Sequence, residues 1–152
     1  MNKLTLKLKK VEQNMIKHLV EAQRETANIV CEDVKKLAPK NTGRYANSIK
    51  VSETIITDGV ITTKVYTDAK VVSSSGKEYN LGYLLETGTS PHIIEPVNAK
   101  ALHFVIDGQD IFVKRVQHPG TVAQPHFSLA KDMNRLVYKQ KINNAIRRSF
   151  NG

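Results

Sequence analysis

The sequence predicts an α+β fold with a long N-terminal helix, antiparallel β-hairpins that form a sheet, and a C-terminal helix packed on that sheet. Three observations predict this class. Apolar residues recur every three or four positions over residues 1–38, and again over residues 127–150. Between them, turn-forming residues separate short stretches rich in β-branched side chains. The length of 152 residues predicts a single domain, 1–152, with the β-rich region at 39–126.

The long N-terminal helix rests on one narrow apolar seam. Its members alternate at spacings of four and three: Leu4, Leu8, Val11, Met15, Leu19, Ala22, Thr26 and Ile29. Pro39 ends the helix, because the residue before a proline is driven out of the helical region. Asn41 or Thr42 can then cap a short turn, and Gly43 lets the chain reverse. Such a seam packs against the sheet or against a neighbouring subunit.

The first hairpin is predicted at the pair Asp58-Gly59, which suits a tight turn that requires positive φ angles. The flanking strands cover residues 49–57 and 60–68. In this register Ile56 faces Ile61, Val51 faces Tyr66 and Glu53 faces Lys64.

The rest of the β-rich region is less regular. Residues 69–79 are polar and predict a mobile loop, and 79–86 form a short helix or strand. A second hairpin pairs 101–106 with 111–117 around a four-residue turn, 107–110. It places Phe104 opposite Val113 and His103 opposite Lys114. Pro125 then introduces the final helix, 127–150.

Positive charge is concentrated at the two ends of the chain. The formal net charge is +9 and the pI is near 9.7, which favours polyanions or acidic protein faces, although basic ends can also simply solvate helices. Lys131, Arg135 and Lys139 are spaced by four and form a basic stripe on the last helix. The residues expected to contact nucleic acid or a partner are Lys131, Arg135, Lys139, Arg147 and Arg148.

The chemistry-bearing residues do not form a recognisable active site. The single cysteine, Cys31, lies on a helical stripe beside two acids, and neither a Walker loop nor a Gly-x-Ser-x-Gly motif occurs. No two histidines have the spacing of a helical metal site. We therefore expect no enzyme, no cofactor and no metal. An enzyme built on His92, His118 and His126 remains an alternative. Since no apolar run approaches ~20 residues, no membrane span is expected.

Five irregular segments are the most distinctive part of the sequence: LAPKNTGR (37–44), LLETGTSPHIIEP (84–96), AKALHF (99–104), VQHPGT (116–121) and QPHF (124–127). In this order they resemble the neck or tail-completion proteins of tailed bacteriophages and prophages. One departure is Arg44-Tyr45, where that family more often has an apolar residue after Thr-Gly. The motif residues, expected to be structural, are Pro39, Thr42, Gly43, Glu86, Gly88, Thr89, His92, His118, Pro119 and Gly120. Glu86 is expected to satisfy backbone donors or Arg44.

The resemblance implies assembly without catalysis. Copies would form a ring at the head–tail junction, between a head-closure or connector protein and a tail terminator or tail-tube protein. Non-specific DNA would pass through the channel. The protein would lie in the virion, and in the host cytoplasm during assembly, without membrane contact. The long helix, the 69–79 loop and the 88–96 loop would contact neighbours. A tail terminator and a free basic nucleic-acid-binding protein are the alternatives.

Overall fold

A computed structural model of the chain describes residues 2–40, 43–73, 76–97 and 99–151. The chain forms two compact units. The first comprises residues 1–67 and 126–152 and is called the helical unit; the second comprises residues 68–125 and is called the hairpin unit. That the two act as a single domain stays a prediction. Asn41, Thr42, Ser74 and Ser75 lie outside the described residues.

The predicted α+β class is confirmed, and the helical unit is dominated by paired helices. Its helices are α1 (Lys3–Leu37), α2 (Arg44–Asn47), α4 (Phe127–Met133) and α5 (Arg135–Phe150). The side chain of Asn2 caps α1 by accepting the Leu4 N–H at 3.4 Å, and the helix ends before Ala38 and Pro39 as expected. None of the helices in the described part of the chain is long and apolar enough to cross a membrane.

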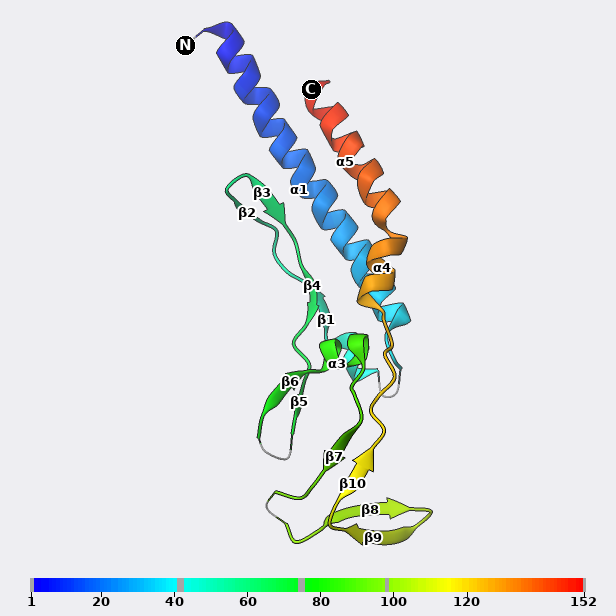
Figure 1. The fold of residues 1–152 in the computed structure, drawn as a ribbon. Helices are drawn as coiled ribbons and strands as arrows, with labels where there is room; N and C mark the ends of the chain where they lie inside the picture. Colours follow the sequence, from blue (N-terminus) through cyan, green and yellow to red (C-terminus); the bar gives the residue numbers. More distant parts are fainter. Residues whose placement is uncertain (1, 41–42, 74–75, 98, 152) are drawn as a thin grey trace. The chain divides into compact units, whose positions relative to one another are not determined.

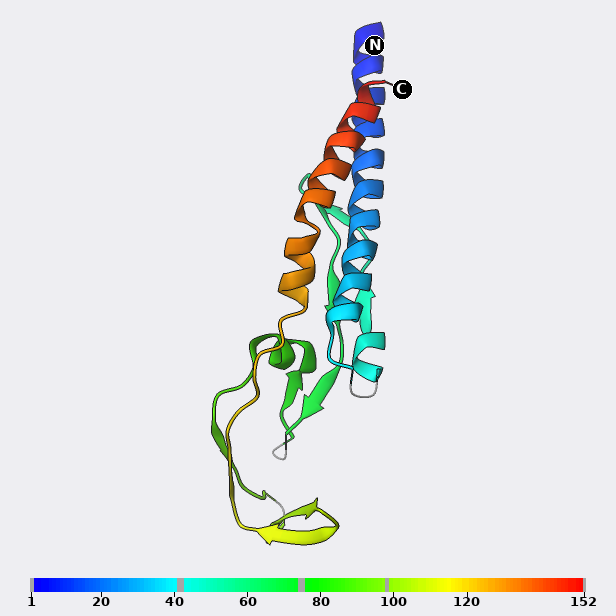
Figure 2. The same cartoon turned by 90° about the vertical axis from the view of Figure 1, so that its right-hand side faces the viewer.

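The C-terminal helices pack mainly along α1. Only α4 also reaches the ladder of β1 (Ile49–Val51) and β4 (Val65–Thr67), through Ala130 and Phe127, so the predicted packing on a sheet is confined to this end. Helices α1 and α5 run side by side in opposite directions, and α1 starts beyond the end of α5 (Figures 1 and 2). The buried positions that face each other are small residues, Ala22 and Thr26 on α1 and Ala145 and Ser149 on α5. Small side chains let two helix backbones approach closely, so this pair forms its own interface.

The predicted helix 127–150 is interrupted at Asn134, which separates α4 from α5. The helical path continues across the break, because the Asn134 N–H bonds to the Ala130 carbonyl and the Tyr138 N–H bonds to the Asn134 carbonyl. The Asn134 side chain donates to Ala130 O and to Asp33 Oδ2, both at 2.9 Å. A buried asparagine therefore joins the two helices to α1.

The helical unit also holds the first hairpin. Its strands are β1 (Ile49–Val51), β2 (Ile55–Thr57), β3 (Val60–Thr62) and β4 (Val65–Thr67). Asp58 and Gly59 both have positive φ, as a primed turn requires. The predicted pair Ile56–Ile61 is correct.

The predicted register is wrong by one residue further from the turn, where Val51 pairs with Val65, and Lys50 with Tyr66. The Ser52 N–H bonds to the Lys64 carbonyl, while the Thr54 and Thr63 hydroxyls meet at 2.8 Å. Glu53 is thus an extra residue without an opposite partner, so it does not face Lys64. A β-bulge of this kind shifts every pair beyond it by one.

The core of the helical unit lies where α1, β1 and α4 meet. It consists of Cys31, Val34, Ala38, Ile49 and Ala130. Burial raises the pKa of the Cys31 thiol, which is the behaviour of a small packed hydrophobe. The core is built from small and medium side chains, so much apolar surface remains uncovered elsewhere.

The hairpin unit consists of short two-stranded ladders around one short helix. Its elements are β5 (Lys70–Val72), β6 (Glu78–Asn80), α3 (Leu81–Thr87), β7 (His92–Ile94), β8 (Leu102–Ile106), β9 (Gln109–Val113) and β10 (Val116–His118). The ladders are β5–β6, β7–β10 and β8–β9, and the strands of the chain do not join one sheet as predicted. Among the described residues of this unit, only Gly82 is buried. Isolated two-stranded ladders with so little core are marginally stable in water.

Three expectations for the hairpin unit are corrected. The predicted loop 69–79 contains strand β5 and most of its partner β6. Asp107 and Gly108 both have positive φ and form a two-residue turn, so His103 faces Phe112 and Phe104 faces Ile111, two residues away from the predicted pairing. Part of the predicted 88–96 loop is strand β7, which pairs with β10.

Candidate functional site

Two motifs that lie 32 positions apart in the sequence meet in the hairpin unit. Thr89 and Thr121 form an isolated antiparallel bridge, with N–H to carbonyl distances of 3.0 and 3.1 Å. The Thr121 N–H also donates to Thr89 Oγ1 at 2.9 Å, and the Gln124 N–H donates to the Leu85 carbonyl at 2.8 Å. We call this junction of residues 88–89 and 120–121 the clasp. It fastens the end of α3 to the segment that follows β10.

Glycine is required on both sides of the clasp. A Cβ on Gly88 would lie 2.4 Å from the Thr121 carbonyl oxygen, and a Cβ on Gly120 would lie 2.2 Å from the Thr89 carbonyl oxygen. Both glycines have positive φ, at 70° and 89°. The contacted atoms are backbone atoms of the bridge itself, so they cannot move aside without breaking it. The predicted motif residues Gly88, Thr89 and Gly120 therefore belong to one structural element.

The histidines His92 and His118 pair across β7 and β10, with ring centroids 5.0 Å apart. His92 Nδ1 lies 2.9 Å from the Ser90 carbonyl oxygen, so this nitrogen donates. His118 Nδ1 accepts the Gly120 N–H at 3.0 Å, so in the neutral ring its Nε2 carries the proton. Each ring thus forms a hydrogen bond with the backbone of its own loop, two residues away. Pro119 lies exposed between His118 and Gly120, and Glu86 is half-buried in the last turn of α3.

The third histidine of the enzyme alternative, His126, lies in the helical unit and is 0% exposed. Its Nε2 lies 2.6 Å from the Tyr45 hydroxyl, and its ring contacts Phe127. This burial removes His126 from any surface at which a substrate could reach it. Among the described residues, no group of three or more His, Cys, Asp or Glu is placed to hold a metal ion.

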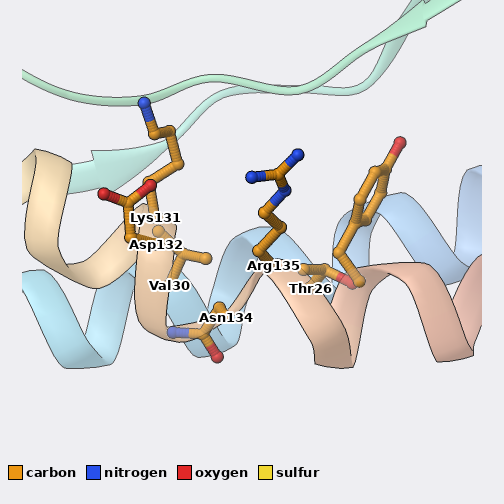
Figure 3. Close-up of a pocket in the computed structure, with 7 residues that line it drawn as sticks. Thr26, Val30, Lys131, Asp132, Asn134 and Arg135 are labelled. Carbon is orange, nitrogen blue, oxygen red and sulfur yellow. The ribbon is translucent and has the colours of Figure 1, made fainter.

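The basic stripe lies over a groove between α1 and the α4–α5 pair (Figure 3). The groove has a volume of about 340 Å³ and is lined by Thr26, Val30, Lys131, Asp132, Asn134, Arg135 and Tyr138. Lys131 and Arg135 extend to the same side of it (Figure 3). Lys139 lies on the adjoining surface beside Leu136 and Ile142. Within the described part of the chain, none of these three cations forms an ion pair. The predicted stripe is therefore free to meet an external acid.

The other basic residues of the last helix differ in their surroundings. Lys141 lies 2.5 Å from Glu25 on α1 and helps to join the helices. The hydrogen bond and charge of Lys141 lower the pKa of Glu25, and the nearby charge of Arg148 contributes to this. Arg147 and Arg148 are exposed in the last turn of α5, where cations favour the negative end of the helix dipole.

Charge is strongly segregated between the two units. The helical unit contains 18 Lys and Arg against 8 Asp and Glu, a net charge of +10. The hairpin unit contains 5 Lys and Arg against 6 Asp and Glu, a net charge of −1. The excess positive charge of the chain thus belongs to the helical unit alone, although the linear sequence shows it only as two basic ends.

Exposed apolar side chains are the feature that sequence reasoning missed. On the β8–β9 hairpin they include Val105, Ile106 and Phe112, and on α4–α5 they include Leu129, Met133 and Leu136. On α1, Leu4 and Leu8 of the predicted seam are exposed as well. In the second hairpin the signal was readable, because apolar residues occupy consecutive positions on both strands instead of alternating with polar ones.

The comparisons with known proteins agree with the phage character of the sequence. The family model described as "Bacteriophage HK97-gp10, putative tail-component" matches residues 2–88. No curated protein and no solved structure matches the chain. The matched region runs from the start of α1 to the first glycine of the clasp and covers more than half of the sequence. The chain therefore belongs to the HK97-gp10-like family of bacteriophage tail components and is a structural, tail-related phage protein.

Proposed function

We propose that copies of this chain form a ring at the head–tail junction of the virion. The ring joins the DNA-filled capsid to the tail and continues the DNA channel. Its neighbours are a head-closure or connector protein on one side and a tail terminator or tail-tube protein on the other. The protein acts by assembly, without catalysis or a cofactor, first in the host cytoplasm and then in the virion.

The single observation that carries this proposal is the amount of apolar surface the isolated chain leaves uncovered. Residues such as Leu136, at 72% exposed, and Phe112, at 67% exposed, lie on elements that would be covered in a self-sufficient protein. Contiguous exposed apolar surface on a soluble protein marks interaction sites. A tail-related structural protein with such surfaces on both of its units is suited to contacts with several neighbours.

The charge of the helical unit supports the proposal that DNA passes through the channel of the ring. A net charge of +10 on one unit attracts a polyanion without reading its sequence. DNA that passes through a channel requires such weak, salt-sensitive contacts to phosphates. The lysines in the first half of α1, from Lys3 to Lys17, and Arg147 and Arg148 of α5 are exposed candidates for this role.

The decisive experiment is electron microscopy of lysates from a phage or prophage that lacks this gene. We expect filled heads and finished tails lying apart, and joined particles once the purified protein is added. Infectious particles of normal appearance in the deletion strain would overturn the junction role. Tails of abnormal length in place of unjoined heads would indicate the tail terminator.

A free nucleic-acid-binding protein is the second candidate, because Lys131, Arg135 and Lys139 have no acidic partner among the described residues. We test it by reversing these three charges to Glu and measuring binding to duplex DNA over a range of salt concentrations. The control reverses Lys40, Lys64 and Lys77, three exposed cations that lie outside the last helices and the β8–β9 hairpin, and changes the net charge equally.

For the junction protein we expect weak DNA binding, with a Kd no tighter than about 10⁻⁶ M at physiological salt. Both reversed variants should fold normally, but the stripe variant should join heads to tails poorly while the control joins them well. A free nucleic-acid-binding protein would instead bind DNA tightly. Its stripe variant alone would lose that binding, and the slope of log K against log salt would fall by about 3.

A further inference from the structure

We propose that the β8–β9 hairpin of one copy docks on the α4–α5 face of a neighbouring copy and is the contact that builds the ring. This inference rests on the proposed function and deepens it, because it names the two surfaces that meet. The occupant of the α4–α5 face is thus a second copy of this chain.

The β8–β9 hairpin exposes apolar side chains that a partner surface would cover. Val105 is 64% exposed, and Ile106, Phe112 and Phe104 are exposed with it on a ladder of only two strands. An isolated hairpin with apolar residues on both faces gains little stability by itself. Its tight turn at Asp107-Gly108 and the stacking of His103 on Phe112, with centroids 4.7 Å apart, nevertheless give it a defined shape. A partner surface is what would cover its apolar side chains.

The α4–α5 face offers a matching surface. Leu136 is exposed beside Arg135, Lys139 and Ile142 on the surface that adjoins the groove of Val30 and Tyr138. Leu129 and Met133 are exposed further around the same helices. This face lies on the outside of the helix pair, since α1 covers the opposite side through Ala130 and Ala145. Leu136 and the groove are thus exposed next to one another, and no described residue buries Leu136, which is 72% exposed.

Charge selects the hairpin of another copy as the occupant. Two helical units, each carrying a net charge of +10, repel one another, which disfavours a symmetric contact between two α4–α5 faces. The hairpin unit carries −1, and the hairpin itself presents Asp107 and Asp110 at its tip. His103 Nε2 meets one carboxylate oxygen of Asp110 at 2.6 Å, which leaves the other oxygen able to accept from a neighbouring copy.

The groove supplies the complementary cations. Lys131 and Arg135 extend from it to one side, Lys139 follows on the adjoining surface, and Asp132 is the single acid among them (Figure 3). Acids at the tip of an apolar hairpin therefore meet cations at the edge of an apolar groove. A contact between two different surfaces is heterologous, and such contacts generate rings when the rotation closes.

Disulfide trapping tests the contact with the full-length protein. Val105→Cys and Leu136→Cys are introduced into one chain, and the native Cys31 does not interfere because it is buried and its thiol pKa is raised. Under oxidation we expect a ladder of dimers, trimers and higher multimers on non-reducing gels, because every copy carries both surfaces. Either single variant should yield dimers at most.

The matched control combines Leu136→Cys with Val122→Cys, a site in the hairpin unit that is more exposed than Val105 at 83%. A ladder of equal yield in this control would overturn the inference, since accessibility alone would then explain the cross-link. A product confined to one chain, or no product from the Val105–Leu136 pair, would overturn it as well.

Charge reversal separates the hairpin contact from DNA binding. Asp110→Lys and Arg135→Glu should each lower the yield of the ladder about fivefold, and the chain that carries both should recover to within about twofold of the starting yield. If the cations of the groove serve DNA instead, Asp110→Lys would not restore the Arg135→Glu chain. Loss of the ladder in a protein that still rejoins heads and tails would reject the contact but leave the junction role standing.

Discussion

Replacing Gly120 by alanine is expected to open the clasp and to unfold most of the hairpin unit, while the paired helices of the other unit remain intact. The new methyl group would lie 2.2 Å from the Thr89 carbonyl oxygen and 2.9 Å from the Ser90 carbonyl carbon. The Thr89 oxygen is the atom that accepts the Thr121 N–H in the bridge, so relief of the clash requires the bridge to separate. Gly88→Ala should act in the same way, through a contact of 2.4 Å with the Thr121 carbonyl oxygen.

The expected loss of stability is large relative to what the hairpin unit can tolerate. A positive φ costs an L-residue about 1–2 kcal/mol, and a forced contact in a packed site adds about 1–3 kcal/mol. The sum, about 2–5 kcal/mol, falls on a unit in which Gly82 is the single buried residue among those described. Amide hydrogen exchange resolved by peptide measures this directly, and residues 68–125 should lose protection while the α1 and α5 peptides keep theirs.

Gly76→Ala is the matched control for the clasp. Gly76 lies in the same unit with a φ of 79°, but nothing lies within 4 Å of the position that a Cβ would take there. This variant therefore carries the conformational cost of about 1–2 kcal/mol without the clash. If Gly120→Ala and Gly76→Ala lose equal protection, the close approach at the clasp contributes nothing and the structural role assigned to this glycine is wrong.

The clasp also shows how far the sequence predicts this fold. Gly88, Thr89 and Gly120 stand out as turn residues in distinctive motifs, and each turn can be predicted from its own motif. The contact between the two motifs cannot be predicted, because the residues around either position do not indicate a bridge to a position 32 residues away. The same reason explains why β7 is missed, since it pairs with β10 across the whole second hairpin.

Local chemistry predicts turns and helices well and register less well. Asp58-Gly59 sets its hairpin because positive φ at both positions is a property of those two residues. The bulge at Glu53 shifts the register of the strands. It could not be predicted from Glu53 itself, because a bulge depends on which backbone groups of the opposite strand are available for pairing. The basic stripe follows from spacing alone, whereas the pairing of Lys141 with Glu25 depends on how α5 lies along α1.

Replacing Asn134 by aspartate is expected to separate the last helices from α1 at neutral pH. The Asn134 amide donates to Asp33 Oδ2 at 2.9 Å from a position that is almost fully buried. Aspartate has nearly the same shape but places a second carboxylate against that of Asp33, at a position that is only 5% exposed to water. Loss of this hydrogen bond costs about 1–3 kcal/mol and the adjacent like charge adds to that cost, and chemical unfolding followed by circular dichroism measures the loss.

The pH dependence distinguishes charge repulsion from simple loss of a hydrogen bond. In the native chain the hydrogen bond from Asn134, followed by that from Lys36, lowers the pKa of Asp33. The stabilisation from a lowered carboxylate pKa is present above the unfolded pKa of about 3.9 and is lost as the pH falls through the folded pKa. In the Asn134→Asp chain the two adjacent carboxylates repel, so one of them takes up a proton more readily. Acidification towards pH ~4 should therefore recover part of the lost stability while the native chain only loses stability.

Two further variants complete the test of this junction. Asn134→Leu removes the hydrogen bonds without adding charge, so its loss should not be recovered by acidification. Asn143→Asp makes the same chemical change at an exposed position of α5 and should alter stability by no more than about 0.5 kcal/mol. A loss in Asn134→Asp that is independent of pH would show that Asp33 is not the group it opposes. The link from α1 through Asn134 to α5 would then rest on packing alone.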